Sequence, residues 1–255
     1  MLREQASGDW RGVLVAPLNH STAGSSGSFL GLASDGQRYW IKTTNNFQHV
    51  QVPVSEQIVG RVGGILGVAV CPVRSIEISE EVAAAGWEIR PGTGRKLEKG
   101  TAHASLELPD CLETRQFEKR DQDDNASRHV GLLALYDLCW GSDVQWLIAT
   151  TQQLAYHGHD HGHFMSGPGW TEASLMGALD KPHEQGDSGA NLNKDTIAAV
   201  ATSLDGLTQG VLVQALSKIP STLPVTDTEL ETVGHFVLHR ASKVAARMRT
   251  RWLGG

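Results

Sequence analysis

Residues 156–164, just past the middle of the chain, have the composition of a site that binds a cation. They read Tyr-His-Gly-His-Asp-His-Gly-His-Phe, so one carboxylate, Asp160, stands between histidines. Mg²⁺ prefers hard oxygen ligands, which a carboxylate provides and an imidazole does not. This composition supports two interpretations: Asp160 holds a magnesium ion, or the run is a divalent-metal patch.

The second interpretation depends on the spacing of the histidines, which occupy every second position from His157 to His163. Residues two apart on a strand point to one face of it. The side chains of His157, His159, His161 and His163 would therefore converge on a metal ion or form a polar ladder.

Composition and charge exclude several classes of protein. The chain has 255 residues, of which 40% are hydrophobic and 20% charged, which is typical of a globular protein with one large domain or two lobes. A net charge of −6 argues against nucleic acid as the main partner. The three cysteines, Cys71, Cys111 and Cys139, are scattered and odd in number, which indicates a reducing compartment. Without a signal peptide or an apolar run of spanning length, we expect a cytoplasmic protein that has no membrane partner.

The first third of the chain is rich in predicted strands. Residues 29–33 and 38–43 predict a hairpin, because Asp35-Gly36 between them is a strong turn signal. A helix is expected over residues 54–66, which have apolar residues at helical spacing. Further strands are expected at 10–15, 68–78 and 86–89, and residues 91–94 are the expected hinge.

Two charged residues in this part have alternative interpretations. Lys42 lies in a predicted strand among large apolar residues, and it either projects to solvent or serves a site. Glu56 lies in the first turn of the predicted helix, where it is either a surface acid favoured by the helix dipole or the partner of Lys42.

A small polar run, residues 21–28, precedes the hairpin. Its composition fits a flexible loop. It also fits a turn that covers phosphate, in which Ser25, Ser26 and Gly27 let backbone amides approach an anion.

The remainder of the chain is mostly helical. Helices are predicted at residues 128–138, 195–204, 206–218 and 228–252. Between the first two, a hairpin of residues 146–149 and 154–157 has Asp143 before it and Asp160 after it.

This order of features resembles the HipA-like kinase family, a bacterial branch of the protein-kinase-like fold. The resemblance rests on Tyr-Trp-Ile-Lys42, Val-Ser-Glu56-Gln-Ile-Val, Trp-Gly-Ser-Asp143 and Asp160-His-Gly-His-Phe, and it covers residues 16–248. It implies an α+β, two-lobed protein-kinase-like fold. The β-rich nucleotide-binding lobe would comprise residues 1–91, and the mostly helical catalytic lobe residues 92–255.

The resemblance also implies a role for each motif residue. Lys42 would bind the α- and β-phosphates of ATP, and Glu56 would position Lys42. Asp143 would stand near the acceptor hydroxyl, and Asp160 would hold Mg²⁺. The family pattern places an Asn shortly after the catalytic aspartate as a second magnesium ligand, but the sequence here reads Val144-Gln145-Trp146-Leu147. Gln145 is the residue that would supply an amide oxygen instead.

Three functions are therefore open. The first is a kinase that transfers the γ-phosphoryl group of Mg-ATP to an unidentified hydroxyl acceptor, for which a protein serine or threonine is one candidate. A regulatory protein is a candidate partner of such a kinase. The second is a kinase-shaped nucleotide-binding pseudokinase with little transfer. The third is a His-rich divalent-metal-binding protein.

Overall fold

The computed structural model describes residues 12–21, 26–151, 154–183 and 189–254. Eight strands lie in this part of the chain: β1 Gly12–His20, β2 Phe29–Ala33, β3 Arg38–Lys42, β4 Val73–Ile78, β5 Gly100–Leu106, β6 Cys111–Thr114, β7 Trp146–Ala149 and β8 Ala155–Gly158. Seven α-helices accompany them: α1 Val52–Ile65, α2 Glu80–Ala84, α3 Asn125–Leu138, α4 Glu172–Ala178, α5 Lys194–Asp205, α6 Gln209–Leu216 and α7 Asp227–Met248. A π-helical turn, η1 Arg249–Leu253, continues α7.

Five of the strands form a closed barrel in the order β1-β2-β3-β5-β4. Neighbouring strands are antiparallel except for β1 and β4, whose parallel pairing closes the ring. The sequence predicted a β-rich first part, and the structure refines this prediction to a small barrel. The turn between β2 and β3 is the predicted one: Gly36 has φ +78°, and the side chain of Asp35 accepts hydrogen bonds from Gln37 N and Tyr39 Oη.

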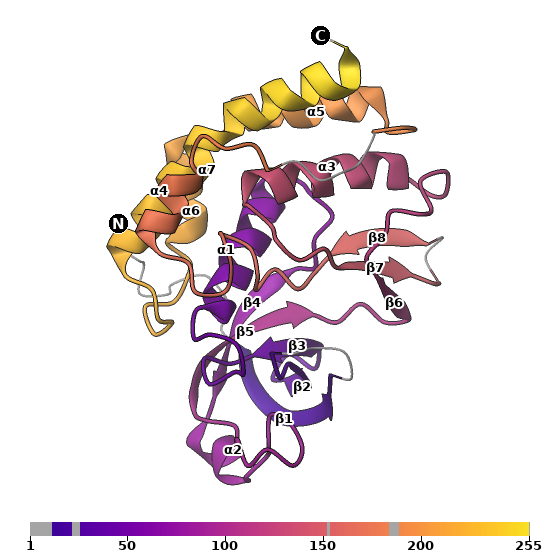
Figure 1. Ribbon diagram of the computed structural model, residues 1–255. Coiled ribbons are helices and arrows are strands. Elements are labelled where there is room, and N and C mark those ends of the chain that lie inside the picture. The colour runs from indigo at the N-terminus through magenta and orange to yellow at the C-terminus, as the bar shows by residue number, and fades with distance from the viewer. Residues whose placement is uncertain (1–11, 22–25, 152–153, 184–188, 255) are drawn as a thin grey trace.

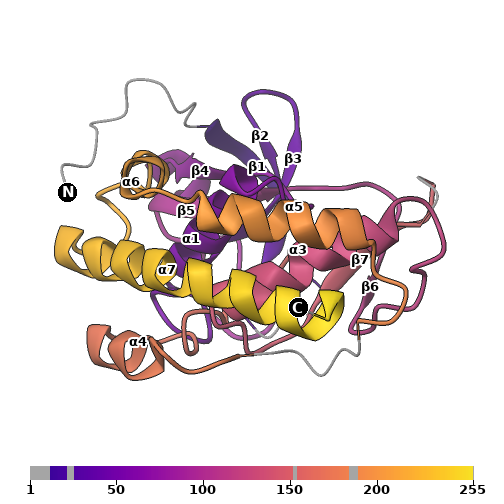
Figure 2. The same ribbon diagram turned by 90° about the horizontal axis from the view of Figure 1, so that it is seen from above.

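The second sheet, β6-β7-β8, lies between the barrel and the layer of helices α3, α5 and α7 (Figure 1). Seen from above, α7 runs beside α5, and α3 lies beneath them (Figure 2). Helix α1 extends from the barrel toward this helical layer.

Buried side chains form two hydrophobic clusters. One fills the barrel and includes Leu14, Phe29 and Ile41. The other joins α1 to the helical layer, because Ile58 and Val62 pack in the same cluster as residues of α3 and α7. Helix α1 therefore belongs by packing to the helices, although it follows the barrel strand β3 directly.

Several predicted elements differ from the structure. Residues 86–89 are not a strand, since only an isolated bridge between Glu88 and Lys96 occurs there. Strands β5 and β6 were missed, because residues 95–124 are polar and lack a clear period. Helix α4 was also missed.

None of the described helices has, by itself, the length and apolarity needed to cross a membrane. Helices α5 and α6 meet that criterion only as a pair, and the pair is bent by 87°.

Candidate active site

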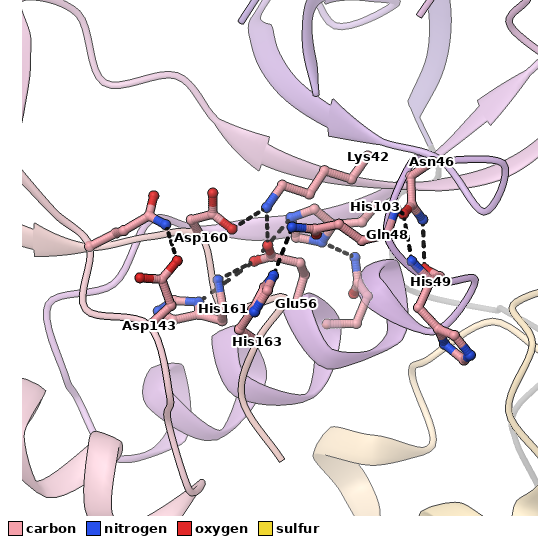
Figure 3. Close-up of polar contacts among 12 residues, drawn as sticks. Lys42, Asn46, Gln48, His49, Glu56, His103, Asp143, Asp160, His161 and His163 are labelled. Carbon is pink, nitrogen blue, oxygen red and sulfur yellow. Dashed lines mark hydrogen bonds and ion pairs between the residues drawn. The ribbon is translucent and has the colours of Figure 1, made fainter. Parts of the chain in front are cut away.

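Three charged residues from distant parts of the sequence meet in the structure. The Lys42 amine, at the end of β3, pairs with the Glu56 carboxylate in α1 and lies 2.5 Å from Asp160 Oδ1 (Figure 3). Lys42 and Glu56 are nearly inaccessible, with 8% and 3% of their side chains exposed, whereas Asp160 is 22% exposed. The Lys42 amine therefore faces Asp160 on the more exposed side of the buried ion pair.

The charges of the pair are mutually stabilised. Burial alone lowers the pKa of Lys42, but the carboxylates of Asp160 and Glu56 outweigh it, and the net pKa is raised. Burial likewise raises the pKa of Glu56, but Lys42 and the nearby imidazoles reverse this, and the net pKa is lowered. Both groups are therefore ionised at neutral pH.

The second oxygen of Glu56 faces the histidine run. Glu56 Oε2 accepts a hydrogen bond from the backbone amide of His161 at 2.9 Å, and His103 Nε2 lies 4.0 Å away. Gln57 Nε2 donates to His103 Nδ1 at 3.1 Å, so this ring carries its proton on Nε2, toward Glu56. Burial lowers the pKa of His103 to about 4, which keeps the ring neutral at pH 7. Glu56 thus connects α1 both to the barrel and to the segment that carries Asp160.

The backbone at Asp160 is unusual. Its φ is +54°, in the left-handed region that residues with a Cβ rarely adopt and that Asp and Asn tolerate best. Two residues later, a Cβ on Gly162 would lie 2.9 Å from Val52 Cγ1 of α1. The chain therefore turns sharply at Asp160 and passes close to α1, a geometry that is often found at functional sites.

A cleft of about 480 Å³ opens beside these residues. Lys42, Glu56, Asp160 and Gln145 line it among the residues expected to form the site. Its other walls come from the barrel strands and from β6 and β7, for example Trp40, Ser105, Glu113 and Leu147. This volume lies in the range of pockets that bind small molecules and cofactors.

Asp143 lies at the edge of this arrangement. Gln145, which lines the cleft, donates a hydrogen bond through Nε2 to Asp143 Oδ2 at 2.6 Å, and Arg115 Nη1 is 3.8 Å from Asp143 Oδ1. Because its nitrogen binds Asp143, the amide oxygen of Gln145 is the atom left for a ligand.

The expected phosphate-covering turn is only partly described, since Ser25 lies outside the described residues. Ser26 is buried, and its carbonyl accepts a hydrogen bond from Phe47 N. A Cβ on Gly27, which has φ +79°, would lie 2.8 Å from the Phe47 ring. The cleft itself is lined by the adjacent Ser21 and Ser28. A role for Ser25, Ser26 and Gly27 in binding a nucleotide stays a prediction.

The four histidines do not converge. His161 faces Glu56, at 3.8 Å, and His163 Nε2 contacts Gln48 Nε2 at 2.7 Å. Strand β8 ends at Gly158, so the alternation on which the prediction relied stops before His159. Within the described ranges, no three His, Cys, Asp or Glu side chains are arranged to hold a metal ion. The prediction of a convergent histidine metal centre is therefore wrong.

Sequence reasoning missed Glu113, which lies on β6 and lines the cleft. Burial and the nearby carboxylate of Asp160 raise its pKa. No strand was predicted around residue 113, and no motif includes Glu113, so the sequence alone offered no reason to place it in the site.

The oxygen donors of the cleft fit a magnesium ion that is bound together with a nucleotide. Asp160, Glu113 and Gln145 offer carboxylate and amide oxygens to one space. Mg²⁺ commonly takes one or two protein carboxylates and completes its shell with water and substrate phosphates, so a closed protein cage is not needed.

Part of the sequence matches a known protein family. Residues 15–137, just under half of the chain, match the sequence model of the HipA-like kinase family. The predicted resemblance to HipA-like kinases is confirmed. The match includes Lys42 and Glu56 and ends before Asp143 and Asp160. A search of curated proteins finds no matching sequence.

Two kinases of known structure have a fold similar to that of this chain. The Helicobacter pylori proinflammatory kinase CtkA superposes with a TM-score of 0.58 at 8% identity, over 94% of this chain and 98% of CtkA. The Golgi casein kinase with Mn/ADP bound gives 0.54 at 10% identity, over 96% of this chain and 74% of that one. A second structure of the Golgi casein kinase gives 0.54 at 11% identity with the same coverage. The chain therefore has a kinase-like α+β fold over nearly its whole length.

Proposed function

We propose that the protein is an ATP-dependent phosphotransferase of the HipA-like kinase type. It transfers the γ-phosphoryl group of Mg-ATP to a hydroxyl acceptor, for which a protein serine or threonine is one candidate. The observation that carries the proposal is the position of the Lys42 amine, which is held between Glu56 and Asp160 at the wall of the cleft.

Each residue of the site has a physical task in this proposal. Lys42 binds the α- and β-phosphates, and Glu56 holds its amine in place, because a pair of opposite buried charges has one preferred geometry. Asp160 provides carboxylate oxygens for Mg²⁺, with Gln145 and Glu113 beside it. The metal supplies charge neutralisation on the phosphates when it is bound.

Asp143 is the proposed partner of the acceptor. Its carboxylate orients the acceptor hydroxyl and accepts the hydroxyl proton as the new oxygen–phosphorus bond forms and the bond from the γ-phosphorus to ADP breaks. Gln145 restrains this carboxylate by donating to Oδ2.

The division of the chain into two lobes is also part of the proposal. A two-lobed arrangement, with a nucleotide-binding lobe of residues 1–91 and a catalytic lobe of residues 92–255, is supported by the separate core of the barrel. Strand β5 lies beyond residue 91 and pairs with β3 and β4, which would move the boundary toward residue 107. A bacterial source, a cytoplasmic location and a regulatory protein partner stay predictions.

A transfer assay tests the proposal. Protein incubated with Mg²⁺ and γ-labelled ATP should label itself or an added protein acceptor, and Asp160→Asn should reduce the rate by about 100-fold or more, since charge stabilisation of the transferring group is lost. Asp180→Asn is the matched control: its carboxylate pairs with His239 and Lys243 away from the cleft, so its rate should equal that of the wild type. Equal rates for all three proteins would contradict the proposal.

A nucleotide-binding pseudokinase is the second candidate, and one observation favours it. The position where the family has a magnesium-binding Asn is occupied by other residues, and Gln145 binds Asp143 through its nitrogen. In this case Mg-ATP would raise the melting temperature without any transfer of label. Label transfer that disappears in Asp160→Asn would exclude this candidate.

A further inference from the structure

Arg240, in the middle of α7, is a buried cation of the helical layer, with 1% of its side chain exposed. A buried charge is unfavourable unless it is paired and fully hydrogen-bonded. Its guanidinium donates to Asp137 Oδ1 at 2.8 Å, and Arg247 Nη2 lies 2.7 Å from Asp137 Oδ2.

The remaining donors of Arg240 bind backbone carbonyls at the ends of two helices. Nη2 binds the carbonyl of Asp137 at 2.6 Å and Nε that of Leu138 at 3.2 Å, both in the last turn of α3. Nη1 binds the carbonyls of Ala178, at the end of α4, at 2.8 Å and of Lys181 at 2.7 Å. The last carbonyls of a helix lack partners inside the helix, so one guanidinium completes the ends of both α3 and α4.

The turn that follows α3 is built against this guanidinium. Trp140 has φ +52°, and its ring lies 4.8 Å from the Arg240 guanidinium and 4.4 Å from the His183 ring. A Cβ on the next residue, Gly141, would come within 2.8 Å of Phe164 and Tyr136. The turn therefore has little freedom to move.

This turn also connects the two acidic residues of the proposed active site. Ser142 Oγ donates to the carbonyl of His163, and Met165 N donates to the carbonyl of Cys139 at 2.9 Å. Asp143 follows directly after these contacts, and Asp160 lies just before His163. The position of Asp143 relative to Asp160 thus depends on the turn after α3. This turn packs against Arg240, whose guanidinium also binds the carbonyls at the end of α3.

We infer that Arg240 is a positioning residue for phosphoryl transfer, which fixes Asp143 against Asp160 without touching either. The inference rests on the proposed function. A lysine cannot replace the guanidinium, because its single ammonium cannot reach carbonyls at the ends of two helices in one plane.

The test compares the wild type with Arg240→Lys. Steady-state transfer should show kcat reduced by about 100-fold, the effect expected when reacting groups are misplaced by about 1 Å, with the KM for ATP changed by less than about threefold because the lysine–carboxylate pair is intact. Hydrogen exchange followed by mass spectrometry should show faster exchange of residues 139–145 and unchanged exchange in α1. Val233→Ala, a buried residue of the same helix, is the stability control and should keep the wild-type kcat while lowering the melting temperature.

Three results would overturn the inference: unchanged exchange of residues 139–145, an unchanged kcat in Arg240→Lys, or an equal loss of kcat in Val233→Ala. If Arg240→Lys fails to fold, Ser142→Ala decides, because Ser142 is exposed and its loss leaves the core intact. A lower kcat with the same KM for ATP supports the inference, and an unchanged kcat overturns it. A wild-type protein without transfer activity would instead reject the proposed function, which keeps the two failures distinct.

Discussion

At the scale of single residues, the candidate site depends on one buried cation that faces two carboxylates. Glu56 neutralises Lys42 inside the protein, and Asp160 approaches it from the cleft. A buried ion pair contributes little net stability, but removal of one partner is costly because the other charge is left uncompensated. The burial of this pair is thus not explained by a gain in stability, and it agrees with the proposed binding of phosphate.

Lys42→Met should lower the free energy of unfolding by about 3–5 kcal/mol, because Glu56 would remain buried without its cation. Adding Glu56→Gln should restore most of the loss, since the amide is neutral and its oxygen can still accept from His161 N. Urea denaturation measures both. An identical loss in the single and double variants would contradict the assignment of Glu56 as the partner of Lys42.

The neutral imidazole beside Glu56 predicts a dependence on pH. The pKa of His103 is about 4 in the folded protein and about 6.5 in the unfolded chain, so only the unfolded state takes up this proton between those values. Stability should therefore fall as the pH is lowered from about 6.5 toward 4. His103→Asn, which keeps an acceptor for Gln57, should flatten this part of the profile of melting temperature against pH. Parallel profiles for the two proteins would disagree with a buried neutral His103.

At the scale of elements, helix α1 carries Glu56 and packs closely against the barrel at one of its glycines, Gly60. Glycine is unfavourable inside a helix, so these residues weaken α1 as an isolated segment. Gly60 permits close packing, because a Cβ there would lie 2.4 Å from Val73 Cγ1 of β4, whereas a Cβ on Gly64 would meet nothing within 4 Å.

The two glycines form a matched pair of substitutions. Gly60→Ala should destabilise the protein by about 1–3 kcal/mol through overpacking. It should also reduce transfer activity, because α1 shifts away from β4 and takes Glu56 with it. Gly64→Ala should be neutral or stabilising by up to about 1 kcal/mol, with full activity. Thermal unfolding and the labelling assay measure the two effects, and similar behaviour of both variants would count against the role of close packing.

The elements that were predicted well are those with a strong local signal. Strands β2 and β7 occupy the predicted residues, and the Asp35-Gly36 turn marks a true hairpin. Strands β5 and β6 depend on pairing with distant partners, which a local pattern does not reveal. The meeting of Lys42, Glu56 and Asp160 followed from the family resemblance, while Glu113 and Arg240 are defined by tertiary contacts that have no motif. The predicted convergence of the four histidines was wrong because alternate residues share a face only within a strand. Strand β8 ends at Gly158, and Asp160 has a left-handed backbone conformation.

At the scale of the whole molecule, the cleft is shared between the barrel and the second sheet. Its lining residues come from β3 and β5 on one side and from β6, β7 and the segment that follows β8 on the other. The sequence match to HipA-like kinases covers Lys42 and Glu56, whereas Asp160 lies outside it. A ligand that contacts both sides would therefore connect the matched and unmatched parts of the chain.

This arrangement predicts a coupled response to the ligand. Mg-ATP should slow hydrogen exchange in β3 and in residues 158–162 together, because the triphosphate contacts both. At a concentration about 100 times its Kd it should stabilise the protein by about 2.7 kcal/mol. Asp160→Asn should remove the Mg²⁺-dependent part of both effects. Protection confined to one of the two segments would disagree with a shared site.

The most direct measurement is a structure of the protein with Mg²⁺ and a non-hydrolysable ATP analogue. We expect the phosphates to lie between the Lys42 amine and the Asp160 carboxylate, with the metal bound by Asp160 and the amide oxygen of Gln145 nearby. A nucleotide bound elsewhere, or a metal that does not contact Asp160, would contradict this expectation.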